Sequence, residues 1–214
     1  MRKNLMAILL ATLLSLNWSP NIMAQQRPED FNHFKEILRF GTNDINLYWQ
    51  TIFANNKRPY ETPSLKAYYK DPIETPCGTM GINNAAYCTK SNTIYFDIDF
   101  LYQKFLTYGD YAVITILAHE WAHAAQFQLR QRELSIWTEN QADCLCGAYT
   151  KALKEGKQNV RLEEGDIEEA EQLMFNIGSS HPDWANNGVH GSSNQRLGNF
   201  RKGLIYGLDS CFNK

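Results

Sequence analysis

The feature that most constrains the fold is the run YAVITILAHEWAHAAQFQLRQ, residues 111–131. Apolar and small residues fill most of its positions, and Glu120 is its only Asp, Glu, Lys or Arg before position 130. The run is too long for an ordinary strand and predicts a mostly apolar helix whose sides face the protein core. The rest of the chain must therefore fold around a helix that carries His119, Glu120 and His123.

Two of these side chains have the spacing of metal ligands. Residues four apart lie on one face of a helix, so the imidazoles of His119 and His123 can reach one ion. Glu120 is rotated by about 100° from His119, so it is better placed to reach a water beside the ion than to bind it. HExxH on a helix thus predicts two zinc ligands and a general base. The alternative is a core helix whose histidines are held by ordinary hydrogen bonds.

A catalytic zinc needs a third protein ligand, and the segment ENQAD supplies a candidate. Glu139 and Asp143 are four residues apart on a second helix, predicted over about 135–155. If the two helices pack with these faces together, Glu139 completes a His2Glu set for one Zn²⁺ per chain. Asp143 can then accept the free N–H of a ligand histidine and fix the orientation of its ring.

The N-terminus has the pattern of an export signal. Basic MRKN precedes the apolar LMAILLATLLSL, and Ala24 offers a cleavage point. We predict a signal peptide over 1–24 and a mature domain over 25–214, secreted or periplasmic. The apolar run is short for a membrane span, so no stable span is expected after signal removal. An uncleaved N-terminal membrane anchor is the alternative.

The chain has five cysteines, which can pair in an oxidising compartment. Cys77 and Cys88 bracket the Gly/Asn-rich loop GTMGINNAAY and are the favoured bridge. One of Cys144 and Cys146 is expected to pair with Cys211, which leaves one free thiol.

The remaining segments predict one α+β domain, mostly helical, with a small sheet beside the HExxH helix. We expect a helix over 29–55, irregular structure over 58–78 and a strand over 92–100. This strand is interpreted as an edge strand that could pair with an extended peptide. In a further helix, Asp166 is expected to cap the N-terminus while Glu169 reaches back, as in a capping box.

The segment HGSSNQR, residues 190–196, offers one more candidate. His190 lies among Gly and Ser, where it could donate to the oxyanion formed on a peptide carbonyl. The alternative is a structural histidine of the loop. Arg196 is interpreted as a residue that ties this loop down.

The formal charge of −2, without a Lys/Arg block, argues against nucleic acid as a partner. A peptide or protein substrate is expected instead, and the oligomeric state is not predicted.

Several segments together resemble the bacterial neutral zinc metallopeptidase family, which is zincin-like. They are CGTMGINNAAYCTKSNTIYFDIDF, AHEWAHAAQ, ENQADCLCGAY, GDIEEAEQLMFNIG and HGSSNQRLGNFRKGL, followed by Cys211. The resemblance implies a gluzincin-type site in which Glu120 is the base and the ligands are His119, His123 and Glu139. It also implies two disulfides, Cys77–Cys88 and Cys144–Cys211. The chain departs from the family at Ser179 and Ser180, where acidic residues are usual, and at Thr89, where proline is usual.

The predicted function is that of an exported zinc metalloendopeptidase, in which Glu120 takes a proton from the attacking water and passes it to the leaving amine. The alternative is a zinc-bound but non-hydrolytic binding or inhibitor protein of the same fold.

Overall fold

The computed structural model describes residues 28–130, 135–178 and 191–212. The predicted signal peptide over 1–24 lies outside these ranges. The described helices are α1 (Pro28–Asn55), α2 (Ile98–Tyr108), α3 (Asp110–Gln128), α4 (Ile136–Lys154), α5 (Asp166–Asn176) and α6 (Ser193–Tyr206), followed by the 3-10 helix η2 (Leu208–Phe212). The described strands are β1 (Ser64–Tyr68), β2 (Ile73–Thr75), β3 (Gly78–Met80), β4 (Ala85–Cys88) and β5 (Thr93–Asp97).

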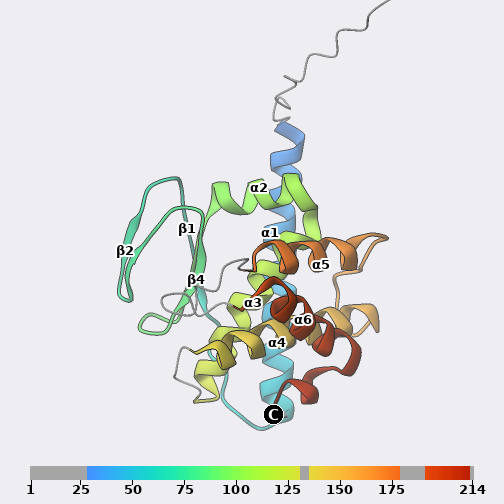
Figure 1. Ribbon diagram of the computed structural model, residues 1–214. Helices are drawn as coiled ribbons and strands as arrows, with labels where there is room; N and C mark the ends of the chain where they lie inside the picture. Colours follow the sequence, from blue (N-terminus) through green and yellow to red (C-terminus); the bar gives the residue numbers. More distant parts are fainter. Residues whose placement is uncertain (1–27, 131–134, 179–190, 213–214) are drawn as a thin grey trace, which may run out of the picture.

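Helices form most of the molecule, and the strands gather on one side of them (Figure 1). Strand β5 is the centre of a three-stranded sheet, with β1 parallel to it on one side and β4 antiparallel on the other. Strands β2 and β3 pair separately. Because β4 contacts α3, the small sheet lies beside the HExxH helix, as predicted. The α+β, mostly helical architecture is thus confirmed.

Three predictions about the strands are wrong. The strand predicted over 92–100 ends at Asp97, whose carboxylate accepts hydrogen bonds from the main-chain N–H of Asn83 and Asp99 and so caps α2. The strand is also central in its sheet, so the edge next to α3 belongs to β4. The segment 58–78, predicted to be irregular, contains β1 and β2. β1 is exposed along most of its length, so long-range pairing with β5, which no sequence period signals, makes it a strand.

Helix α3 is the core of the protein, as its composition predicts, because the described helices and β4 enclose most of its length. Its N-terminus is capped from outside. Gly109, at φ +119°, precedes the helix and brings no capping side chain, and the main-chain N–H of Tyr111 donates to Glu169 of α5 at 3.0 Å. Burial raises the pKa of Glu169 to about 7, against the lowering effect of the hydrogen bond from Tyr111. Because it accepts the main-chain N–H of Tyr111, the carboxyl group of Glu169 caps α3.

The capping box predicted at the start of α5 is consequently wrong. The N-cap residue of α5 is Gly165, without a side-chain hydrogen bond, and Asp166 is the first residue of the helix. The Asp166 carboxylate accepts the main-chain N–H of Glu163 at 2.7 Å. Glu169 instead accepts from the buried N-terminus of α3, because an uncapped buried helix end leaves N–H groups without partners. This tertiary contact outweighs the local capping-box pattern.

Helix α6 packs against α4 through glycines on both helices. A Cβ on Gly203 would overlap the carbonyl oxygen of Cys144, and one on Gly147 would overlap that of Phe200. The backbones of the two helices are therefore in direct contact, which fixes α6 relative to α4.

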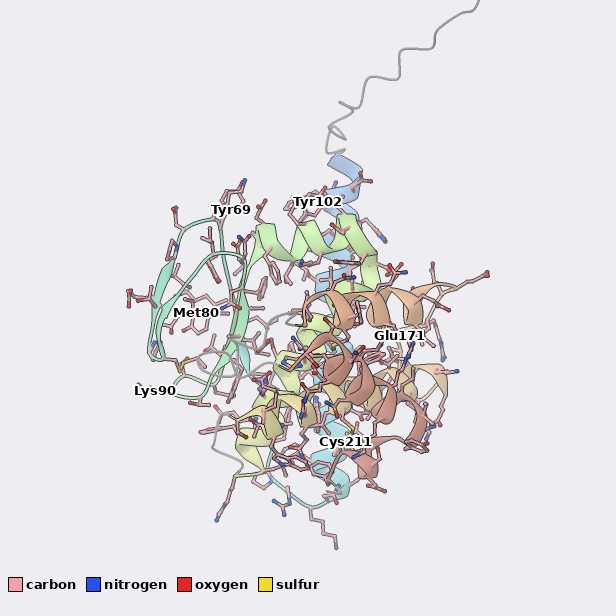
Figure 2. The ribbon with its side chains drawn as sticks, viewed as in Figure 1. Tyr69, Met80, Lys90, Tyr102, Glu171 and Cys211 are labelled. Atoms are coloured by element: carbon pink, nitrogen blue, oxygen red, sulfur yellow. A yellow bond between two sulfur atoms is a disulfide. The ribbon has the colours of Figure 1, made fainter. Side chains whose placement is uncertain are left out.

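A disulfide joins Cys144 of α4 to Cys211 of η2 and closes this contact, and Figure 2 shows Cys211 at the η2 end of the chain. A second disulfide joins Cys77 to Cys88, and Cys146 is a buried free thiol. Of Cys144 and Cys146, it is therefore Cys144 that pairs with Cys211 in the structure.

Candidate metal centre

Helices α3 and α4 lie side by side and bring three side chains to one point. Nε2 of His119 is 3.1 Å from Nε2 of His123, and each nitrogen is 3.3 Å from a carboxylate oxygen of Glu139. Zinc bonds of about 2.0–2.1 Å place the ligand atoms of a tetrahedral ion about 3.3–3.4 Å apart. The two nitrogens face different oxygens of the Glu139 carboxylate, Oε2 for His119 and Oε1 for His123, and all three separations are close to the edge length of a zinc coordination tetrahedron.

The site is shielded from solvent. His119 and Glu139 are both 4% exposed, whereas the side chain of His123 is 13% exposed. Three carboxylates, those of Glu120, Glu139 and Asp143, lie in this region with one guanidinium. Such an excess of buried negative charge favours a cation, so the donor set, its spacing and its charge all fit Zn²⁺.

Asp143 holds the first histidine from behind. Its Oδ1 accepts a hydrogen bond from Nδ1 of His119 at 2.9 Å, which leaves Nε2 of that ring toward Glu139. Burial acts to lower the pKa of His119, but the charge and hydrogen bond of Asp143 outweigh it and raise that pKa to about 10. Asp143 therefore favours positive charge at the ring, whether a proton or a metal ion supplies it.

Arg196, in turn, holds Asp143. Its Nη2 and Nε donate to the two carboxylate oxygens at 2.7 and 3.1 Å, and both residues are buried. Although burial by itself raises the pKa of Asp143, Arg196 and His119 hold it below its usual range. Arg196, interpreted from the sequence as tying its segment down, lies on α6 and binds Asp143 of α4.

Glu120 is 7% exposed and faces β4. The main-chain N–H of Tyr87 donates to its Oε2 at 2.9 Å. This bond comes from the edge of the sheet that α3 contacts, and it fixes the carboxylate one residue beyond His119.

Sequence reasoning found Asp143 but missed the contact of Tyr87 with Glu120 and that of Arg196 with Asp143. Tyr87 acts through its main chain and leaves no sequence signal. Arg196 had one, because Ser192 and Gln195 form a capping box, which places Arg196 in the first turn of a helix. His190, the predicted oxyanion donor, lies outside the described residues.

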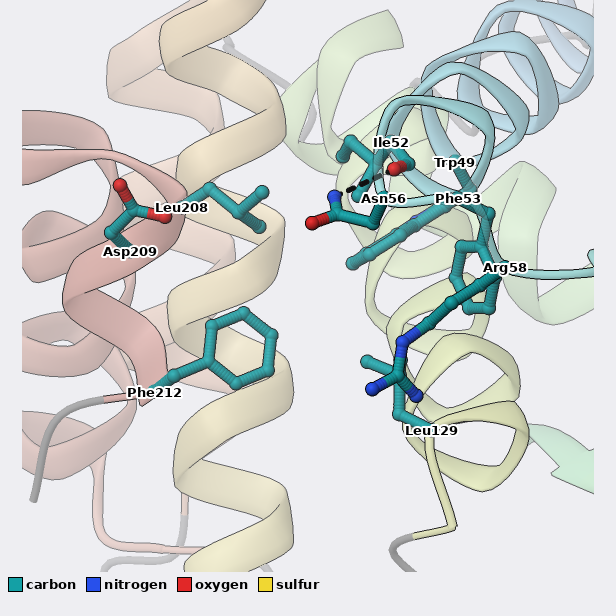
Figure 3. A pocket seen from close by; sticks show the side chains of 9 residues that line it. All are labelled: Trp49, Ile52, Phe53, Asn56, Arg58, Leu129, Leu208, Asp209 and Phe212. Carbon is teal, nitrogen blue, oxygen red and sulfur yellow. Dashed lines mark hydrogen bonds between the residues drawn. The ribbon is translucent and has the colours of Figure 1, made fainter.

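A cavity of about 360 Å³ lies apart from these residues, between the ends of α1 and α3 and η2. Figure 3 shows Leu208 and Phe212 on one side of it and Phe53 and Arg58 on the other. None of the predicted site residues lines it, so it is separate from the candidate metal centre.

The HExxH helix and the converging His, His and Glu side chains are the arrangement expected of a zinc peptidase. The sequence profile of the family described as "Putative neutral zinc metallopeptidase" matches residues 15–212, and the chain belongs to this family. Comparison with curated proteins and with solved structures gave no match.

Proposed function

We propose that this chain is an exported zinc-dependent endopeptidase that hydrolyses peptide bonds. The observation that carries the proposal is the convergence of Nε2 of His119, Nε2 of His123 and the carboxylate of Glu139, with spacings of 3.1–3.3 Å. Glu120 follows His119 directly in the chain and supplies the carboxylate that such a reaction needs.

The proposed roles follow from the positions of the side chains. The three converging residues would hold the ion, which when bound supplies Lewis acidity toward water and the scissile carbonyl. Glu120 takes a proton from the attacking water and later donates it to the nitrogen of the leaving amine. The water oxygen bonds to the carbonyl carbon, the C–N bond breaks, and an acid and an amine result. His190 is the proposed donor to the oxyanion.

Two disulfides support function in an oxidising compartment, consistent with the predicted signal peptide. No helix among the described residues is long and apolar enough to span a membrane. The proposed partner is therefore a peptide or protein substrate met outside the cytosol.

Three chains test the proposal: the wild type, Glu120→Gln and His123→Ala. Metal analysis should find about one zinc per chain in the first two and a loss in the third. Hydrolysis of unfolded protein and peptide libraries should be seen only with the wild type. Full activity in Glu120→Gln would refute the base assignment. Zinc without any hydrolysis in the wild type would favour the non-hydrolytic binding protein instead.

A further inference from the structure

A chain of buried hydrogen bonds runs from the second histidine to the far side of α4. Nδ1 of His123 is 2.9 Å from Oε1 of Gln126, and Nε2 of Gln126 donates to Oε1 of Gln141 at 2.9 Å. Nε2 of Gln141 in turn donates to the carbonyl oxygen of Cys211 at 3.1 Å. Gln126 and Gln141 are 2% and 4% exposed, so the chain is closed to solvent.

The ends of this chain determine the direction of every bond in it. A main-chain carbonyl only accepts, so the amide that faces Cys211 must present its NH2 group. Nε2 of Gln126 also donates to the carbonyl of Thr138 at 2.8 Å, which fixes the Gln126 amide a second time. The two amides therefore cannot be flipped without setting oxygen against oxygen.

The direction of the bonds decides the tautomer of His123. Oε1 of Gln126 cannot donate, so Nδ1 of His123 must carry the proton that this hydrogen bond requires. Nε2 then keeps its lone pair, and it is this nitrogen that lies 3.3 Å from Glu139. In solution the other tautomer competes, so the protein removes a choice that would otherwise weaken binding at Nε2.

We infer that Gln126 is a positioning residue that holds His123 as the Nδ1–H tautomer, and that Gln141 and the Cys211 carbonyl hold Gln126. This inference rests on the proposed zinc site. It extends that site to η2, which the Cys144–Cys211 disulfide attaches to α4. Both ligand histidines are then supported from the C-terminal part of the chain, His119 through Asp143 and Arg196 and His123 through the two glutamines.

The test is zinc affinity, measured by competition with a chromophoric chelator on the metal-free chain. Gln126→Met keeps the length of the side chain but removes both hydrogen-bonding functions, and it should weaken zinc binding about 10- to 100-fold. Gln128→Met is the matched control. It lies on the same helix and its amide makes two hydrogen bonds, but these are to the exposed main chain of Glu61. The control should bind zinc like the wild type.

A second variant covers the case in which Gln126→Met does not fold. Gln141→Met leaves Gln126 bonded to Thr138 and should lose only severalfold in zinc affinity. A spectroscopic readout is the Nδ1–H proton of His123 in zinc-loaded, 15N-histidine-labelled protein. It should exchange slowly in the wild type and faster in either variant.

The outcomes separate the two claims. Wild-type zinc affinity and wild-type exchange in a folded Gln126→Met or Gln141→Met chain would overturn the positioning role and leave the proposed zinc site intact. A wild-type chain that takes up no zinc on titration would instead overturn the proposed function, and the inference with it.

Discussion

The contact between α4 and α6 makes a prediction with opposite outcomes for two glycines of one helix. Gly203 of α6 faces α4, whereas Gly198 faces open space, where an added Cβ would have no neighbouring atom within 4 Å. Replacing each by alanine adds the same methyl group to the same helix. Only the surroundings differ, so helix propensity cancels in the comparison.

The magnitude follows from the distances at each site. A Cβ at 203 would overlap the carbonyl oxygen of Cys144 and lie 2.7 Å from the amide nitrogen of Ala148, where ordinary contact begins at 3.4 Å. Backbone atoms cannot rotate away, so the helices must separate, and the cost is at the upper end of the overpacking range, about 3 kcal/mol. Gly198→Ala should instead stabilise the chain by about 0.5–1 kcal/mol, the helix preference of alanine over glycine.

The assay is urea unfolding of the metal-free chain, followed by far-UV circular dichroism, because bound zinc would add its own stabilisation. Separation of the helices in Gly203→Ala should also lengthen the bonds of Arg196 to Asp143 and weaken zinc binding. Gly198→Ala should leave zinc binding unchanged. A Gly203→Ala chain within about 0.5 kcal/mol of the wild type would refute the argument that backbone contact positions α6.

Three further changes test the framework around the site. Burial raises the pKa of Glu169 to about 7. The protonated side chain therefore contributes stability that is complete below the pKa of Glu169 in the unfolded chain and is lost as the pH rises through 7. Glu169→Gln keeps an acceptor without the charge, so in thermal melts it should be more stable than the wild type at pH 8 and similar to it at pH 4. Replacing Cys144 and Cys211 by alanine removes a disulfide of sequence separation 67 and should lower the free energy of unfolding in urea by about 4 kcal/mol. Replacing Cys77 and Cys88, whose separation is 11, should lower it by about 3 kcal/mol. Equal or reversed losses would contradict the argument from loop entropy. Asp44 accepts hydrogen bonds from the hydroxyl of Tyr149 and from two main-chain N–H groups. Asp44→Ala should therefore lower the free energy of unfolding in urea by about 3 kcal/mol. Asp44→Asn keeps one acceptor and should lower it by about 1 kcal/mol.

The parts of the site that the sequence predicts are those set by one helical period. His119 and His123 are four residues apart, as are Glu139 and Asp143, and a helix places each pair on one face wherever it packs. The sequence also predicts helices α3 and α4 within a few residues, since their apolar patterns are long. It does not predict strand β1, because the partner strand β5 determines β1 and the residues of β1 are mostly exposed.

Arg196 and Gln141 follow a different logic, because each acts across a tertiary contact. Arg196 reaches Asp143 over 53 residues, and Gln141 reaches Cys211 over 70. No local period connects such positions, and a buried arginine or glutamine has no pattern that separates it from an exposed one. Their contribution depends on the approach of α6 to α4, which two glycines permit and one disulfide maintains.

The proposed metal centre therefore depends both on local helical spacing and on tertiary contacts. The proposed ligands lie within 21 consecutive residues, 119–139, and helical spacing predicts them once α3 and α4 pack with these faces together. The side chains that orient the two imidazoles, Asp143 and Gln126, are in turn held by the C-terminal part of the chain, Asp143 by Arg196 and Gln126 through Gln141 by the carbonyl of Cys211. Because an imidazole binds an ion only through an unprotonated nitrogen, we expect the zinc affinity of the proposed site to depend on the packing of the C-terminal helix as well as on the HExxH motif.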